Sequence, residues 1–172
     1  PLSLMKQAIT SGDASVLDSM PSSLHLLLGN NINGGAGTIG EVCALALLLG
    51  LAFMLWKKII TWHIPVSIIL SAFVFASLLH LATPIYADPL SVVLTGGMML
   101  GAIFMATDYT TSPMTRRGQM IYGTAIGLLT IVIRNWGAYP EGMSFAILIM
   151  NAFTPLINNY CKPKRFGEVL KK

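Results

Sequence analysis

Polar and hydrophobic positions divide the chain into five long uncharged apolar runs separated by short polar segments. These runs are the stretch around Val42–Trp56, the run Ile59–Ala87 with its apolar centre near Ile64–Ala82, and the runs Pro89–Thr107, Gly118–Ile133 and Gly142–Cys161. A helix needs about 20 mostly apolar residues to cross the roughly 30 Å hydrocarbon core of a bilayer. The pattern therefore predicts five transmembrane helices, one for each run.

The first and fourth runs are short for such a helix, so they must recruit flanking polar residues or lean on neighbouring protein. Lys58 blocks extension of the first run at its C-terminal end, and its helix must therefore begin near Gly37. This start places Glu41 inside a membrane helix. An ionisable side chain is costly there unless it is paired or used.

The runs also divide the chain into three parts. Residues 1–36 contain short clusters of Ser, Asp, Gly and Pro, which indicate a surface segment with one or two short helices. Residues 37–161 form the predicted five-helix transmembrane domain, and residues 162–172 form a basic tail. The expected fold class is an all-α integral membrane protein.

Composition supports the membrane class. Of the 172 residues, 54% are hydrophobic and 10% are charged, whereas soluble domains carry about 25% charged residues. Cys43 and Cys161 lie near opposite predicted membrane faces and belong to no metal-ligand spacing. We therefore expect neither a disulfide between them nor an iron–sulfur cluster held by this chain alone.

Positive charges predict the orientation, because short cytoplasmic loops collect Lys and Arg. If the first helix runs from outside to inside, only Lys6 and Arg134 of the 11 Lys and Arg residues fall on the outer side. The C-terminus is then cytoplasmic and residues 1–36 lie outside. The basic residues stand mostly in pairs at helix ends and form no patch, which argues against nucleic-acid binding. The inner nine are Lys57, Lys58, Arg116, Arg117, Lys162, Lys164, Arg165, Lys171 and Lys172.

A glycine-rich stretch, "NNINGGAGTIGE", precedes the first run. Gly34 and Gly35 let the backbone approach a ligand or another helix closely, and a helix start with free N–H groups attracts anions such as phosphate. The alternative is that the glycines serve helix packing and that Glu41 interacts favourably with the helix dipole in the first turn.

Asp108 ends an uncharged run and is followed by Tyr109, Thr110, Thr111 and Ser112. Such a concentration of oxygen atoms suits a hard cation. The alternative is an ordinary turn, since Asp and Ser favour turns, Pro113 ends a helix, and Arg116 or Arg117 could pair with Asp108. Both interpretations remain open from spacing alone.

Arg134 departs from the charge bias of the outer side and requires a partner. A phosphate group would supply one, and so would a carboxylate such as that of Glu141, seven residues along the chain. The sequence favours the pairing with Glu141.

Three segments together carry a resemblance to a known family. "NNINGGAGTIGE", "FMATDYTTSPMTRRGQMIYG" and "RNWGAYPEGMSFAILIMNAFTPLIN" resemble the C-terminal half of the D subunit of Rnf electron-transport complexes. They are similar, less closely, to the B subunit of sodium-pumping NADH:quinone oxidoreductases. The resemblance implies that the five predicted helices are half of a larger helical bundle in the bacterial cytoplasmic (inner) membrane.

The resemblance also implies a cofactor. Members of the family carry FMN joined through its phosphate to a Thr in a motif that continues with Pro-Leu, and this sequence begins at Pro1-Leu2. The attachment Thr would immediately precede Pro1. Gly34, Gly35 and Arg134 are then candidate contacts of the flavin or its phosphate, together with Pro1 and Leu2. Whether a second, non-covalent riboflavin is held stays open.

The function implied is electron transfer between ferredoxin and NAD coupled to movement of Na⁺ or H⁺, performed by a multisubunit enzyme in which this chain is not catalytic alone. The expected partners are a flavin-bearing subunit on the outer side and iron–sulfur subunits. Asp108 matches the family's cation-linked acidic residue, although Tyr109 departs from the family pattern, and Glu41 is a second ion-path candidate. A passive channel for ions or small solutes, or a structural scaffold without a redox centre, are the alternatives.

Overall fold

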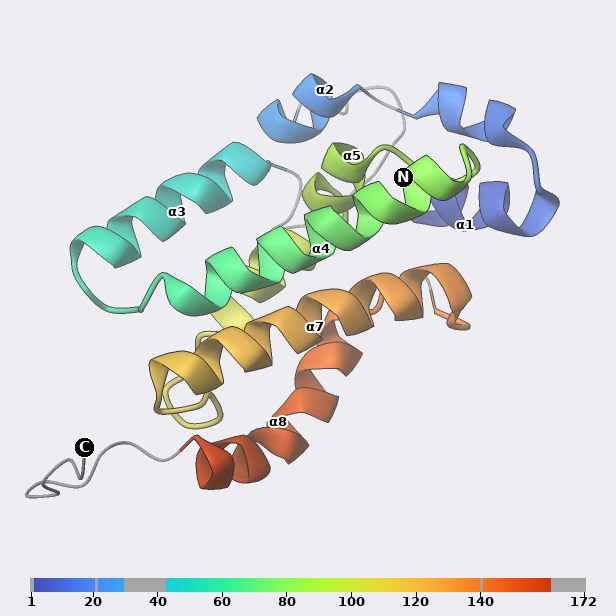
Figure 1. Ribbon diagram of the computed structural model, residues 1–172. Helices are drawn as coiled ribbons and strands as arrows, with labels where there is room; N and C mark the ends of the chain where they lie inside the picture. Colours follow the sequence, from blue (N-terminus) through green and yellow to red (C-terminus); the bar gives the residue numbers. More distant parts are fainter. Residues whose placement is uncertain (1, 21, 30–42, 140, 162–172) are drawn as a thin grey trace, which may run out of the picture.

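The computed structural model describes residues 2–20, 22–29, 43–139 and 141–161, and these residues form helices joined by loops, with no strand among them (Figure 1). The elements are α1 (Leu2–Ser11), the 3₁₀ helix η1 (Ala14–Ser19), α2 (Ser23–Leu28), α3 (Ala44–Trp56), α4 (His63–Ala82), α5 (Pro89–Leu94), α6 (Met98–Leu100), the π-helix η2 (Gly101–Met105), α7 (Arg116–Trp136) and α8 (Met143–Tyr160).

Four of the five apolar runs coincide with one long helix each, namely α3, α4, α7 and α8. By length and composition, α4 is the one helix among the described residues that could cross a bilayer unaided, and α3 is a shorter apolar helix. The all-helical class is confirmed. The count of five spans stays a prediction.

The third run differs from its prediction as one continuous helix. It is divided into α5, a break at Thr95–Gly97, α6 and the π-helix η2. Thr95 has extended backbone angles, and Gly96 has a φ of +70°, a conformation that favours glycine. Two short helical pieces therefore meet end to end where the sequence pattern predicts an unbroken rod.

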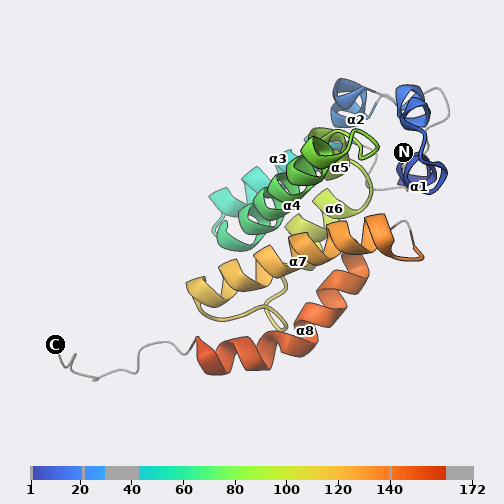
Figure 2. The ribbon, with the colours of Figure 1, turned by 45° about the vertical axis from the view of Figure 1, so that its right-hand side comes forward.

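The helix α7 lies between α4 and α8 in both views (Figures 1 and 2). Its contact with α4 is close because Gly123 and Gly127 face Ser67 and Ser71, whose hydroxyls donate to carbonyls of their own helix at 2.9 and 3.1 Å. Small residues spaced four apart on both helices allow the backbones to approach, as in other membrane helix pairs.

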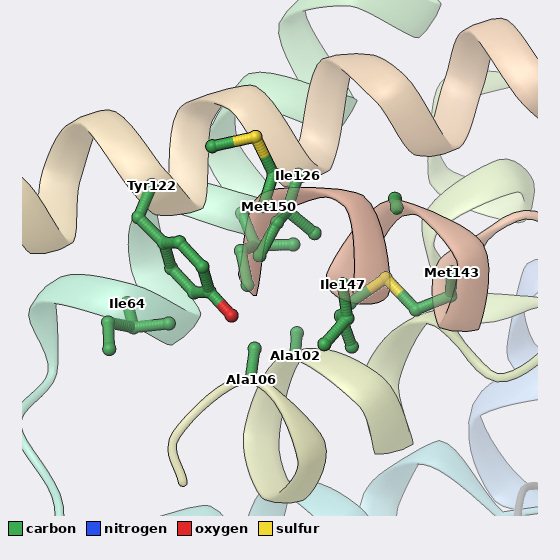
Figure 3. Packing of buried hydrophobic residues seen from close by; sticks show 10 residues of the cluster. Ile64, Ala102, Ala106, Tyr122, Ile126, Met143, Ile147 and Met150 are labelled. Atoms are coloured by element: carbon green, nitrogen blue, oxygen red, sulfur yellow. The ribbon is translucent and has the colours of Figure 1, made fainter. Parts of the chain in front are cut away.

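A buried cluster fills the space between α7, α8 and the α6–η2 segment (Figure 3). Tyr122 and Ile126 enter it from α7, while Met143 and Ile147 enter from α8. The opposing wall consists of small residues, including Ala102. The broken third segment is therefore held at the centre of the bundle and not at its edge.

The outward faces of the helices are strongly apolar. Leu70 and Leu81 on α4 are 59% and 82% exposed, and Leu148 on α8 is 65% exposed. An extended exposed apolar surface of this kind is typical of contact with lipid or with further protein. The surface agrees with the membrane class indicated by composition.

The substitution Gly127→Ala tests the close contact between α4 and α7. An added Cβ would lie 2.6 Å from the backbone oxygen of Ile68, which cannot move aside as a side chain can. We expect a loss of about 1–3 kcal/mol in the free energy of unfolding. Thermal unfolding in detergent measures it, with Thr124→Ala on the exposed face of α7 as the matched control. Equal stability of the two variants would contradict the close approach.

Candidate functional site

The two ends of the bundle differ in charge. Lys57 and Lys58 follow α3, and Arg116 and Arg117 begin α7, at the end where the hydroxyl of Tyr109 donates to the Ile59 carbonyl. Lys6 lies at the opposite end, where it donates to the carbonyl of Gly137 after α7. The basic residues that the structure describes are thus divided between the two ends as predicted, whereas the basic residues of 162–172 lie outside the described residues. We use "inner end" and "outer end" for the two ends.

Arg134 lies in the last turn of α7 at the outer end, and it is 5% exposed. Its Nη1 donates to the Val92 carbonyl at 2.8 Å, and its Nη2 donates to the Thr95 carbonyl at 3.1 Å. These carbonyls belong to the end of α5, where a helix leaves its last C=O groups without partners in the helix. The guanidinium of Arg134 thus donates to carbonyls that would accept from backbone N–H groups in an unbroken helix.

Glu141 completes the arrangement with the opposite charge. Its Oε1 lies 3.3 Å from Arg134 Nη2, while its Oε2 accepts from the N–H of Gly97 at 3.0 Å. Its Oε1 also accepts from the N–H of Met143, the first residue of α8, at 3.3 Å. The predicted pairing is confirmed. We call Arg134 and Glu141 the clasp, because together they hold both sides of the break.

The beginning of α1 packs against the clasp. A Cβ at Gly96 would lie 2.5 Å from the Leu2 side chain, 2.6 Å from Glu141 Oε2 and 2.7 Å from Arg134 Nη2. Leu2 and Arg134 also line one small cavity of about 20 Å³. Two of the predicted cofactor contacts are thus neighbours, whereas Pro1, Gly34, Gly35 and Glu41 lie outside the described residues.

The groove near Leu2 fits the ring of a flavin better than its phosphate. The cavity beside Leu2 holds about one water molecule, but a groove of about 450 Å³ shares Tyr86 and Ala87 with it. That volume is in the range of small-molecule sites. The described residues lining the groove include Asp18 and Asp88 and no Lys or Arg, so the groove matches a neutral ring and not an anionic group.

Asp108 lies exposed in the inner-end loop between η2 and α7. Its carboxylate accepts hydrogen bonds from the hydroxyl of Thr110 and, at 3.3 Å, from that of Thr111. The hydrogen bond from the Thr110 side chain is the largest cause that lowers the pKa of Asp108, since it stabilises the charged form. The carboxylate is therefore ionised at neutral pH.

Residues 109–111 form a turn, which agrees with one part of the turn interpretation of the Asp108 segment. Among the described residues, neither Arg116 nor Arg117 forms an ion pair with Asp108, and no group of three His, Cys, Asp or Glu side chains could hold a metal ion. Asp108 as a step on an ion path stays a prediction.

Sequence reasoning missed the break in the third run and the hydrogen bond between Tyr122 and Asn151 at 2.5 Å. The pair Gly96-Gly97 in the middle of an apolar run was the available signal for the break. Pro155 lies in the interior of α8, four residues after Asn151. It was the available signal for Asn151, because a proline leaves the carbonyl four residues earlier without its helical donor.

An all-helical bundle with an extended exposed apolar surface is typical of helical membrane proteins. A family described as NQR2, RnfD, RnfE matches residues 1–167. The chain belongs to this family.

Three relatives show how far the similarity extends. The D subunit of the Na(+)-translocating ferredoxin:NAD(+) oxidoreductase complex of Acetobacterium woodii is 46% identical, over 97% of this chain and 48% of the relative. The D subunit of the ion-translocating oxidoreductase complex of Stutzerimonas stutzeri is 39% identical, over 90% and 43%. The D subunit of the proton-translocating ferredoxin:NAD(+) oxidoreductase complex of Clostridium ljungdahlii is 43% identical, over 76% and 40%. The chain spans about half the length of the relatives it matches.

The substitution Gly96→Ala tests the clasp. It adds both an unfavourable positive φ and a clash with Leu2 and the clasp, so we expect a loss of about 2–4 kcal/mol in the free energy of unfolding. Gly12→Ala is the matched control, because Gly12 has a φ of +74° and nothing within 4 Å of an added Cβ. It should lose only the backbone part, about 1 kcal/mol. Chemical denaturation measures both, and equal losses would show that the clasp does not crowd Gly96.

Proposed function

We propose that this chain is part of the membrane-embedded D subunit of an ion-translocating ferredoxin:NAD oxidoreductase in the bacterial cytoplasmic membrane. The match of residues 1–167 to the family, with relatives named as subunits of such complexes, carries the proposal. The all-helical fold and its apolar surface support a membrane location. The chain acts as one component of a multisubunit enzyme and is not catalytic alone.

The proposed topology has five spans, with the inner end and the C-terminus in the cytoplasm. The separation of Lys and Arg between the two ends supports this orientation. The break between α5 and α6 supports counting the third run as one span made of two pieces, since broken helices occur in membrane proteins where other groups satisfy the freed backbone. The clasp supplies those groups.

The cofactor proposal is FMN attached to a Thr immediately before Pro1. The position of Leu2 beside a groove of about 450 Å³ supports it, because an attached ring would reach the groove from there. Bound FMN would accept and donate electrons. In this chain Leu2 and Tyr86 would position it, and the flavin-bearing and iron–sulfur partner subunits would approach from the outer end or through the membrane.

Peptide mapping of the full-length polypeptide tests the cofactor proposal. We expect a mass increase that corresponds to a flavin phosphate on the Thr before Pro1, with in-gel flavin fluorescence. The preparation must be active and must come from a host able to attach flavin. An unmodified residue in such a preparation would remove the redox proposal and favour the channel or the scaffold.

The ion proposal assigns Asp108 to the inner end of the path. Its exposure to the inner-end solvent and its lowered pKa, caused first by Thr110, keep a negative charge where a cation would enter. One relative is named for Na⁺ and another for protons. Either ion is therefore compatible with a chain of this family.

Substitution of Asp108 separates an ion path from a scaffold. Asp108→Ala should reduce ion uptake by proteoliposomes at least fivefold while flavin content stays at the wild-type level, because the entering cation loses its carboxylate. The measurement is ion uptake during ferredoxin-driven NAD reduction. Asp13→Asn, an exposed carboxylate at the start of η1, is the control and should behave as wild type. Unchanged uptake in Asp108→Ala would argue against the assignment.

A further inference from the structure

A polar pair lies inside the bundle, away from the clasp and from the Asp108 turn. Tyr122 is completely buried, and its hydroxyl donates to Asn151 Oδ1 at 2.5 Å. Figure 3 shows the hydroxyl pointing away from α7 toward the wall that contains Ala102 and Ala106. By helix rise, Tyr122 lies roughly 9 Å from the first residue of α7. The polar atoms are thus well inside the segment that would lie in the membrane.

A second feature frees another oxygen of the same residue, Asn151. Pro155 stands in the interior of α8 and has no N–H. The carbonyl of Asn151, four residues earlier, therefore lacks the donor that an ordinary helix supplies. Because α8 runs from the outer end to the inner end, this carbonyl points toward the inner end, and α8 changes direction along its length (Figures 1 and 2).

Two oxygen atoms therefore meet between α7 and α8, the Tyr122 hydroxyl and Asn151 Oδ1, and the carbonyl freed by Pro155 belongs to the same Asn151. The wall beside them contains the small residues Ala102 and Ala106, and the chain between these residues forms the π-helix η2, an irregularity frequent at functional sites. Asn151 makes no other side-chain hydrogen bond with the part of the chain that the structure describes.

A negative charge lies nearby. Asp108 is two residues beyond Ala106, which belongs to the same buried cluster as Tyr122. Asp108 is exposed at the inner end, whereas Tyr122 is completely buried. The Tyr122–Asn151 pair therefore lies inside the bundle, and an exposed carboxylate lies at the inner end of the same bundle.

We propose that the Tyr122 hydroxyl, the Asn151 side chain and the Asn151 carbonyl freed by Pro155 form a binding site for a small hard cation, Na⁺. Oxygen ligands are those that such cations prefer, and unwound carbonyls serve this purpose in broken membrane helices. The charge of Asp108 attracts the cation, and the Tyr122–Asn151 hydrogen bond holds the site closed until the cation replaces it. The site rests on the ion-translocating function proposed above.

A purely structural hydrogen bond would explain Tyr122 and Asn151, but it gives no role to Pro155. Proline in a helix interior sacrifices a hydrogen bond and destabilises the helix. The two interpretations therefore differ at Pro155. Pro155→Ala restores an N–H that can donate to the Asn151 carbonyl. If the pair is only structural, this hydrogen bond should stabilise the protein. If the carbonyl binds a cation, the same hydrogen bond should weaken cation binding.

The test uses the full-length complex in proteoliposomes, with Na⁺ uptake and ferredoxin-driven NAD reduction measured over a range of Na⁺ concentrations. Pro155→Ala and Tyr122→Phe should each raise the half-saturating Na⁺ concentration at least fivefold. Electron transfer with an ionophore present should stay within twofold of wild type. Asn151→Asp, which keeps the oxygen ligands, should still respond to Na⁺, whereas Asn151→Leu should lose the response. Tyr139→Phe, on an exposed ring, is the matched control.

A second measurement keeps the site testable without transport. Na⁺ in place of choline should raise the thermal unfolding temperature of the purified full-length protein, and this rise should disappear in Tyr122→Phe and Pro155→Ala. Absence of coupled transport in the wild type would contradict the proposed function, while the thermal shift would still test the site. Wild-type Na⁺ dependence in both variants, or a wild type with no response to Na⁺, would overturn the cation site.

Discussion

The ion pair between Arg134 and Glu141 is the interaction on which the centre of the bundle depends. The third apolar segment stops at Thr95 and starts again at Gly97, which exposes carbonyls on one side and an N–H group on the other. Inside a membrane each such group costs several kcal/mol if nothing pairs with it. The guanidinium pairs with the carbonyls and the carboxylate pairs with the N–H. A charged pair, usually a liability in hydrocarbon, here replaces the missing turn of helix.

The clasp also connects elements that are far apart in the sequence. Glu141 reaches the start of α8 through Met143, and α1 covers the break through Leu2. On the other side of α7, the contact of Gly127 with α4 fixes the helix that carries Arg134. The position of the broken segment, and with it the loop that holds Asp108, is therefore set by α7 and not by the segment's own short helices.

Sequence reasoning located α3, α4, α7 and α8 because long apolar runs have few alternatives in a membrane protein. It also identified the partner of Arg134, since Glu141 is the nearest carboxylate in the chain and both lie at the same end of α7. It failed at the break, because glycine is common in continuous membrane helices and Gly96-Gly97 is by itself a weak signal. The Tyr122–Asn151 pair depends on which faces of α7 and α8 meet, and a single sequence does not encode this visibly.

The break has a consequence for the order in which the protein is made. The three groups that the clasp satisfies in the third segment are separated from their partners by 39, 42 and 44 residues, all of them synthesised later. At a synthesis rate of about 5–20 residues per second, that chain takes roughly 2–9 s to emerge. During this interval α5 and α6 have no internal means to satisfy their facing ends. The third segment therefore cannot complete the hydrogen bonds at its break until α7 and the start of α8 have been synthesised, which makes its final packing a late step in biogenesis.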